Sequence, residues 1–258
     1  MLNVGLNMFS LRHKMKCRED FLDTAIRLRD MGYSFMQFSG APFDAELIRS
    51  VTREAGLPVY LTHVPYDRIV NDTEALMREH ESFGCHMIGL GRIDSATVVD
   101  ESRIYSVIES LERAAARMKS EGFGFFYHNH HTDLYRHRGI TVLDYMLENA
   151  PSINFTLDTY WLQYGGVSVT EYIRKFSGRI ACVHLKDYRI IAEGEGAEIK
   201  MRPVFAPVGE GNMNFKAIVP EMKAAGSEYF IVEQDNAPTF PDPLDEVRRS
   251  IDYIRAEL

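Results

Sequence analysis

The sequence is poor in cysteine and contains no long apolar run, and both absences restrict what the protein can be. Its 258 residues include only three widely spaced cysteines, Cys17, Cys85 and Cys182. That number and spacing fit neither a disulfide framework nor a CxxC metal site, so we expect a reducing, cytoplasmic location. No apolar stretch approaches the roughly 20 residues that a membrane span needs. The N-terminal residues also lack the segments of a signal peptide.

Excess positive charge is missing as well. Lys and Arg number 29 against 37 Asp and Glu, which gives a formal net charge of -8 at pH 7. Nucleic-acid binding depends on clustered Lys and Arg that neutralise phosphates, so we expect no nucleic-acid partner. The acidic balance does not exclude a small anionic substrate that one or two local cations hold.

A repeated unit is what the sequence does contain: a short apolar run, then an amphipathic stretch that often ends in glycine. The apolar runs lie at residues 3–9, 34–40, 58–64, 86–91, 123–130, 153–161, 179–187 and 229–235. The first four helical stretches end at Gly32, Gly56, Gly84 and Gly122, and the later helices are expected near 140–150, 168–177, 214–226 and 243–257. Glycine just past a helix is typical of a left-handed C-cap.

Eight strand–helix units in one direction indicate parallel strands, and at this length they most simply close into a single (β/α)₈ TIM barrel over residues 1–258. An open doubly wound sheet is the alternative, but no GxGxxG follows the first strand. Residues 188–206 form two alternating runs around "GEG", which predicts a β-hairpin inserted after strand seven. We expect this hairpin to stand over the barrel mouth as a lid or wall, or to serve a dimer contact. As a lid it would bring Arg189, Lys200 and Arg202 toward an anionic substrate.

Polar residues collect where the predicted strands end. In a TIM barrel these ends meet at one face, where the chemistry lies. The residues are Asn7, Gln37, His63, His128, Asn129, His130, Asp158, His184, Lys186, Asp187, Glu233 and Asp235. Any one of them is more often a satisfied hydrogen-bonding residue than a ligand. So many converging on one mouth are harder to explain without a bound cation and a polar ligand, because unpartnered burial is costly.

A divalent-metal site is one chemistry that these residue types support. Asp158, His184, Glu233 and one residue of strand five offer carboxylate oxygen and imidazole nitrogen, without cysteine. Such donors suit Mn²⁺, Zn²⁺, Co²⁺ or Mg²⁺.

Several motifs in order along nearly the whole chain carry a family resemblance. "GLNMFSLR" (5–12), "LTHV" (61–64), "YHNHHTDL" (127–134), "LDTYWLQYGG" (157–166), "VHLKD" (183–187), "PVGEGNMNF" (207–215) and "VEQD" (232–235) resemble the sugar phosphate isomerase/epimerase family of the xylose isomerase-like TIM-barrel superfamily. The resemblance implies a metal held by Asp158, His184, Glu233 and a strand-five residue. That fourth ligand is commonly the Glu of an "ENH" motif, and His128 takes its place in the "HNH" found here. Asp133 and Gln37 likewise stand where Glu is usual.

The resemblance implies a carbohydrate enzyme that works through an enediolate. We expect a divalent-metal-dependent isomerase or epimerase, with Mn²⁺ as the first choice of ion. Glu233 and His130 would move the proton, and Lys186 would bind a substrate oxygen unless it only pairs with Asp187 or Asp235. Because one carboxylate of the usual pair is missing, a lyase or dehydratase of the inosose dehydratase type is the alternative. A non-catalytic sugar-binding barrel is the third possibility.

The remaining expected contacts are with a small carbohydrate substrate. His63 is expected to hydrogen-bond it or to be structural, and Trp161, the single tryptophan, to stack on a sugar ring or pack the barrel top. Asn7, Asp187 and Asp235 are the other candidate substrate-binding residues. A homodimer is expected by analogy only.

Overall fold

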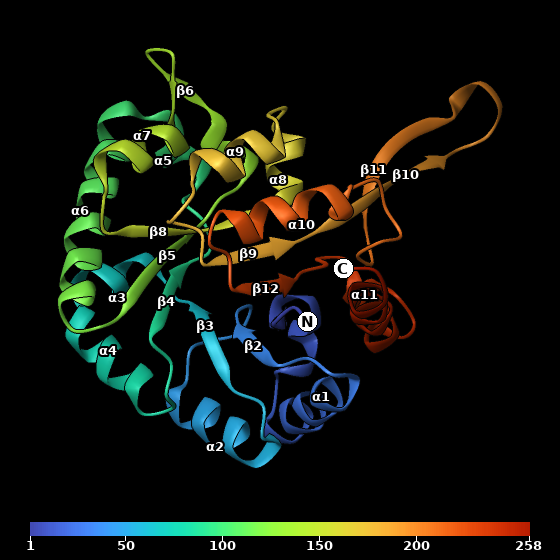
Figure 1. Ribbon diagram of the computed structural model, residues 1–258, viewed down its shortest axis with the longest axis horizontal. Coiled ribbons are helices and arrows are strands. Elements are labelled where there is room, and N and C mark those ends of the chain that lie inside the picture. The colour runs from blue at the N-terminus through green and yellow to red at the C-terminus, as the bar shows by residue number, and fades with distance from the viewer.

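A computed structural model describes residues 1–258 and contains a closed barrel of eight parallel strands (Figure 1). Neighbouring strands follow the order β1, β12, β9, β8, β5, β4, β3, β2 and back to β1. The strands are β1 (Val4–Asn7), β2 (Phe35–Phe38), β3 (Val59–His63), β4 (Met87–Leu90), β5 (Gly124–His128), β8 (Ile153–Asp158), β9 (Cys182–Leu185) and β12 (Tyr229–Val232). Closure confirms the barrel over the open doubly wound sheet.

Helices surround the barrel, as the sequence pattern predicts (Figure 1). They are α1 (Arg18–Met31), α2 (Ala45–Ala55), α3 (Tyr66–Asn71), α4 (Thr73–Glu81), α5 (Ser95–Val99), α6 (Glu101–Ser120), α7 (Val142–Asn149), α8 (Thr159–Tyr164), α9 (Val169–Lys175), α10 (Phe215–Ala224) and α11 (Pro243–Glu257). Gly32 and Gly56 cap α1 and α2 with φ of 100° and 66°, the left-handed conformation expected of them. No helix is both long and apolar enough to cross a membrane.

The barrel interior has an apolar layer directly below its polar mouth. Five buried side chains form this layer: Phe35, Leu61, Phe126, Cys182 and Ile231. Side chains two residues apart on a strand point to the same face. The next inward position on each of these strands is therefore polar, and the five residues are Gln37, His63, His128, His184 and Glu233. The strand period alone thus carries these five side chains to one place.

A separate apolar core lies between the strands and the outer helices. It comprises 60 buried residues drawn from nearly every element. Phe21, Phe38, Phe155 and Phe176 are among its largest fully buried side chains. Because both faces of each strand are covered, the strands are apolar without strict alternation.

Two hairpins interrupt the strand–helix rhythm. The predicted one pairs β10 (Asp187–Glu193) with β11 (Lys200–Ala206) in antiparallel register, from Asp187 opposite Ala206 to Glu193 opposite Lys200. It projects outward beyond the helical ring, so its tip does not cover the barrel as a lid would (Figure 1). A smaller hairpin, β6 (Arg136–His137) with β7 (Ile140–Thr141), was not anticipated from the sequence. Four short 3-10 helices, η1 (Met8–Lys14), η2 (His131–Leu134), η3 (Gly196–Glu198) and η4 (Ala237–Thr239), complete the chain.

Candidate functional site

The mouth of the barrel holds a cavity of about 430 Å³, a size that suits a small polar molecule. Only two of its 13 lining residues are hydrophobic. They are Phe9, Ser39, His63, Gly91, Arg92, Ser95, His128, His130, His131, Thr132, Trp161, Glu233 and Asp235. Glycines 89 and 91 leave room for His63, because a Cβ on either would lie 3.1 Å from the imidazole.

Four buried side chains converge at the floor of this cavity. His128, Asp158, His184 and Glu233 each offer one ligand atom, and these atoms lie within 4.8 Å of one another. Asp158 Oδ2 is 3.3 Å from His128 Nε2 and 3.6 Å from His184 Nδ1, while Glu233 Oε2 is 2.6 Å from His184 Nδ1. Two carboxylates and two imidazoles at this spacing could hold a divalent cation.

Gln37 determines which nitrogen of His184 faces the carboxylates. The Nε2–H of His184 donates to Gln37 Oε1 at 2.7 Å, and Gln37 Nε2 donates to His63 Nε2 at 2.7 Å. His63 Nδ1 then donates to Ser39 Oγ at 3.2 Å. In neutral His184 the Nδ1 lone pair therefore points at Asp158 and Glu233, an arrangement that requires a proton or a cation between them.

The pKa values of the cluster also indicate that a proton or a cation lies between His184 and the two carboxylates. Burial alone would lower the pKa of His184, but the charges of Glu233 and Asp158 outweigh burial and raise it to about 9. Burial would raise the pKa of Asp158 and of Glu233, yet the Lys186 ammonium and the neighbouring histidines hold both well below their usual range. Two fully buried carboxylates thus stay ionised, as metal ligands must be.

Lys186 lies behind the cavity rather than in its lining. Its side chain is 1% exposed, and Nζ lies 2.8 Å from Asp235 Oδ1, 3.5 Å from Glu233 Oε1 and 3.9 Å from Asp158 Oδ2. The rings of Trp161 and Phe205 lie against it, at 5.1 and 4.9 Å from Nζ. Lys186 therefore pairs with Asp235, which was the alternative expected for it. A contact between Lys186 and a substrate oxygen stays a prediction.

His130 faces the cavity from the segment after β5. Its ring centroid lies 4.6 Å from that of His128 and 5.1 Å from that of Trp161, and its Nδ1 is buried without a partner. The Asp133 carboxylate accepts from the His130 backbone N–H at 2.7 Å, which fixes the turn. Burial, followed by the charges of His128 and Lys186, lowers the pKa of His130 to about 2, so its imidazole is neutral.

Comparison of the sequence and the structure with known proteins assigns the chain to a family. Residues 26–257 match the family described as "Xylose isomerase-like TIM barrel". The chain belongs to the xylose isomerase-like TIM-barrel family. A solved sugar phosphate isomerase/epimerase from Parabacteroides distasonis ATCC 8503 superposes with a TM-score of 0.81, covers 98% of this chain and 93% of its own, and is 19% identical. At that identity the likeness shows the shared barrel.

Curated relatives carry an enzyme name. The inosose dehydratase of Geobacillus thermodenitrificans (strain NG80-2) is 30% identical over 172 residues, which are 63% of this chain and 57% of that protein. The match thus spans little more than half of that relative's length. The inosose dehydratase of Clostridium perfringens (strain 13 / Type A) is 24% identical over 92% of this chain and 80% of its own. The family and its relatives agree with the expectation of an enzyme.

Asp187 anchors a loop. Its carboxylate is fully buried and accepts from the backbone N–H groups of Tyr188, Gly209, Gly211 and Met213 at 2.8 to 3.1 Å. These four contacts serve the turn that follows the β10–β11 hairpin. A contact between Asp187 and substrate stays a prediction. The "GEG" of residues 209–211 is shaped by this contact.

Asn7 and the hairpin cations also lie outside the cavity lining. The Asn7 side chain accepts from Phe9 N at 3.0 Å and so starts η1. Arg202 forms an ion pair with Glu193 within the hairpin, and Arg189 lies 3.9 Å from Glu210. Only the base of the hairpin reaches the site, where Phe205 joins Trp161 and Lys186. His63, Trp161 and Asp235, in contrast, line the cavity as expected.

Sequence reasoning did not single out one side of the cavity. Arg92, Ser95, His131 and Thr132 line it from the segments after β4 and β5. Their positions just past the carboxyl ends of two strands were the available signal, since such segments build the working face of a TIM barrel.

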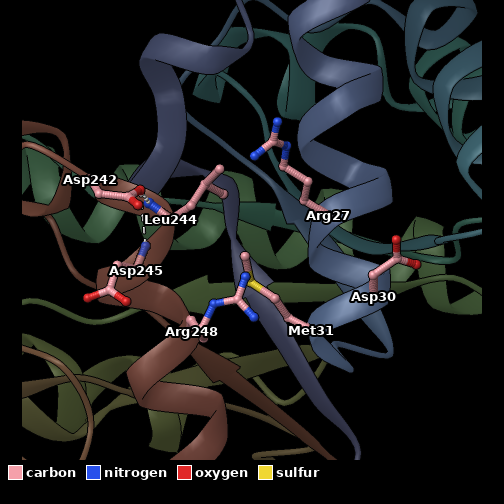
Figure 2. Close-up of a pocket in the computed structure, with 7 residues that line it drawn as sticks. All are labelled: Arg27, Asp30, Met31, Asp242, Leu244, Asp245 and Arg248. Atoms are coloured by element: carbon pink, nitrogen blue, oxygen red, sulfur yellow. Dashed lines mark hydrogen bonds between the residues drawn. The ribbon is translucent and has the colours of Figure 1, made fainter.

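A second hollow of about 310 Å³ lies on the outside of the barrel, between α1 and the start of α11 (Figure 2). It is lined by Arg27, Asp30, Met31, Asp242, Leu244, Asp245 and Arg248. None of these residues comes from a strand end. The four residues whose ligand atoms lie close enough to share one metal ion are at the barrel mouth instead.

Proposed function

We propose that the protein is a divalent-metal-dependent isomerase or epimerase acting on a keto-sugar or a sugar phosphate through an enediolate. One observation carries the proposal. The donor atoms of His128, Asp158, His184 and Glu233 converge within 4.8 Å beside a polar cavity, and a neutral histidine lies next to them. Proton transfer next to a carbonyl needs both a group that stabilises the enediolate and positioned proton carriers.

The four converging side chains would hold the ion, and Mn²⁺ is our first choice for this mixed nitrogen and oxygen set. A bound divalent ion would polarise the substrate carbonyl and stabilise negative charge on its oxygen. Gln37 contributes by keeping the Nε2–H of His184 occupied, which leaves Nδ1 for the ion. The ammonium of Lys186 supplies positive charge close to both carboxylates when the ion is absent.

Two groups of the chain are placed to move the proton. The Glu233 carboxylate lies at the cavity floor on one side, and the imidazole of His130 faces the cavity from the other strand end. The ligating nitrogen of His128 would be occupied by the ion, whereas His130 Nδ1 has no partner and stays free to carry a proton. Glu233 would remove the proton next to the carbonyl, and the neutral imidazole of His130 would deliver one by releasing its N–H proton as the other nitrogen accepts a proton from solvent; the reverse direction is equally open to the pair. Trp161 offers an apolar ring against which a sugar can pack.

A dehydratase acting on a keto-sugar or keto-cyclitol is the second candidate. The names of the curated relatives favour it, as does His128 in the place where the family resemblance implies a Glu. One base that removes an α-proton, followed by loss of the β-hydroxyl as water, needs one carboxylate rather than two. The neutral imidazole of His130 would then relay a proton to the leaving hydroxyl, accepting one at one nitrogen as it releases the other, so that the hydroxyl departs as water.

Deuterium exchange tests the proposal and separates the two reactions. Metal-loaded protein is incubated in D₂O with a panel of keto-sugars, their phosphates and keto-inositols, and the products are followed by NMR. Isomerisation or epimerisation incorporates deuterium at a retained carbon centre, whereas dehydration yields an unsaturated product with one water fewer. We expect Glu233→Gln and His130→Gln to lose the reaction by at least 100-fold, while His86→Gln, on the outer surface, retains it.

Absence of any exchange or product with the metal-loaded wild type would sink both candidates. It would leave the third possibility, a sugar-binding barrel without chemistry.

A further inference from the structure

Arg92 is the only side chain in the cavity lining with a permanent positive charge. The other charged groups of the lining are Glu233 and Asp235, at the floor of the cavity and on its β12 side. Arg92 follows β4, while Glu233 and Asp235 follow β12 on the far side of the strand order. The cavity is therefore acidic where the four candidate ligands converge and basic at the β4 side.

The backbone that carries Arg92 is held from both ends. Ile93 is 5% exposed and packs in the main core, which anchors the residue next to Arg92. Asp94 accepts from Thr97 N at 2.9 Å and from Thr97 Oγ1 at 2.7 Å, as the cap of α5. The nearest carboxylate in the sequence is thus committed to the helix. Arg92 itself makes no hydrogen bond and no ion pair.

Charges around Arg92 leave its guanidinium available. The charge of Arg92 acts on the buried Asp133 carboxylate, but Asp133 Oδ2 accepts from the His130 backbone N–H and the two side chains form no ion pair. After burial, the charge of Arg92 is the second cause that lowers the pKa of His131, which places the guanidinium on the η2 side of the mouth. The hairpin cation Arg202, by comparison, is neutralised by Glu193 and lies outside the lining. Arg92 is thus the one cationic side chain at the cavity that no carboxylate neutralises.

We propose that Arg92 binds an anionic substituent of the substrate, a carboxylate or a phosphate, at the end of the molecule away from the four candidate metal ligands. The planar guanidinium offers two parallel N–H donors to either oxyanion, and both groups match its geometry. Ser95 and Thr132 line the cavity beside it, and no other side chain occupies their hydroxyl groups. The assignment deepens the proposed function, on which it rests for the position of the sugar, and it selects acidic or phosphorylated sugars over neutral ones.

Binding measurements test the assignment without requiring turnover. Trp161 is the single tryptophan and lines the same cavity, so its fluorescence reports occupancy. Metal-loaded protein is titrated with fructose 6-phosphate, gluconate and fructose, which supply a phosphate, a carboxylate and no charge. We expect at least one of the two anions to bind at least 10-fold more tightly than fructose, and the preferred anion identifies the source of the negative charge.

Three variants locate the effect. Arg92→Ala should weaken the preferred anion by 10- to 100-fold and leave fructose binding and metal content unchanged. Arg92→Lys keeps the positive charge but lacks the two parallel N–H donors of the guanidinium, so its affinity for the anion should lie between those of wild type and Arg92→Ala. Arg53→Ala removes an exposed arginine on α2, outside the cavity, and should match wild type.

The assignment is overturned if Arg92→Ala binds the anions as wild type does, or if wild type binds neither anion more tightly than fructose. Failure of the proposed function appears elsewhere, as missing metal or missing deuterium exchange. The two outcomes therefore remain distinguishable.

Discussion

Gln37 Oε1 lies 2.7 Å from Nε2 of His184, and this one contact assigns the other nitrogen of the histidine to the two carboxylates. The same amide donates to His63, so the three side chains on β2, β3 and β9 form a fixed chain. Partners of this kind orient a ligand and hold its tautomer, which is why their loss lowers metal affinity without removing a ligand.

Gln37→Met should therefore weaken divalent-metal binding by about 10- to 100-fold. The thioether cannot accept strongly from His184, so the imidazole loses its fixed orientation and tautomer. Gln37→Glu should retain most of the affinity, because a carboxylate oxygen still accepts from Nε2–H. Titration of metal-free protein with Mn²⁺, followed by electron paramagnetic resonance of the free ion, measures both. Equal affinity in wild type and Gln37→Met would show that the contact does not orient His184.

Metal binding itself should be visible as stability. A ligand that binds only the folded state raises the free energy of unfolding by about 2.7 kcal/mol when its concentration is 100 times its Kd. We expect Mn²⁺ to raise the Tm of wild type, and mass spectrometry to find close to one divalent ion per chain. His128→Ala and Glu233→Ala should lose both effects. His86→Gln is the matched control on the outer surface. If adding Mn²⁺ leaves the Tm of wild type unchanged, the metal site is contradicted.

The sequence predicted the barrel because every strand repeats one simple pattern. Strand periodicity places Phe126 below His128 and Ile231 below Glu233, so the apolar layer and the polar mouth follow from the same spacing. Three of the four converging residues were recognised from residue type at a strand end. Assigning His128 as the fourth also required the family resemblance.

The sequence could not show which hydrogen-bond or ion-pair partner each side chain at a strand end has. Asp187 and Asp235 both follow a strand and look alike in sequence, yet only Asp235 pairs with Lys186. Asp187 is taken by backbone N–H groups of residues 209–213, more than 20 positions away. Arg92 was passed over for a related reason, since an arginine after a strand is unremarkable until its lack of a partner is visible.

Asp187→Ala separates an anchoring role of that carboxylate from a role in binding substrate. The change leaves the buried or half-buried N–H groups of Gly209, Gly211 and Met213 without an acceptor, and each such loss costs on the order of 1–3 kcal/mol. We expect the free energy of unfolding in urea to fall by about 3 kcal/mol, with Mn²⁺ affinity of the folded protein nearly unchanged. A substrate contact would give the opposite pattern, full stability and impaired binding of sugar.

His80 should make the protein acid-sensitive. This buried histidine donates from Nδ1 to Leu76 O at 2.7 Å, accepts from Thr62 Oγ1 at 2.8 Å, and stacks on Phe43 at 4.8 Å between ring centroids. Burial is the main cause that lowers its pKa from 6.5 to about 4. Above pH 6.5 the group is neutral in both states and its stabilising contacts are intact. As the pH falls from 6.5 to 4, His80 becomes protonated in the unfolded chain but stays neutral in the folded chain. Proton binding therefore favours the unfolded state, and the free energy of unfolding decreases.

The loss should amount to about 3 kcal/mol over that interval. His80→Gln cannot titrate, so comparing it with wild type isolates the contribution of His80 to the free energy of unfolding. We expect the variant to be less stable than wild type at pH 7, and the difference in free energy of unfolding should shrink toward pH 4. Urea unfolding of both proteins at pH 7, 6, 5 and 4 measures this, because every other titrating group is common to the pair. A difference in free energy of unfolding that stays constant across the series would mean that His80 binds its proton equally well in the folded and unfolded chain.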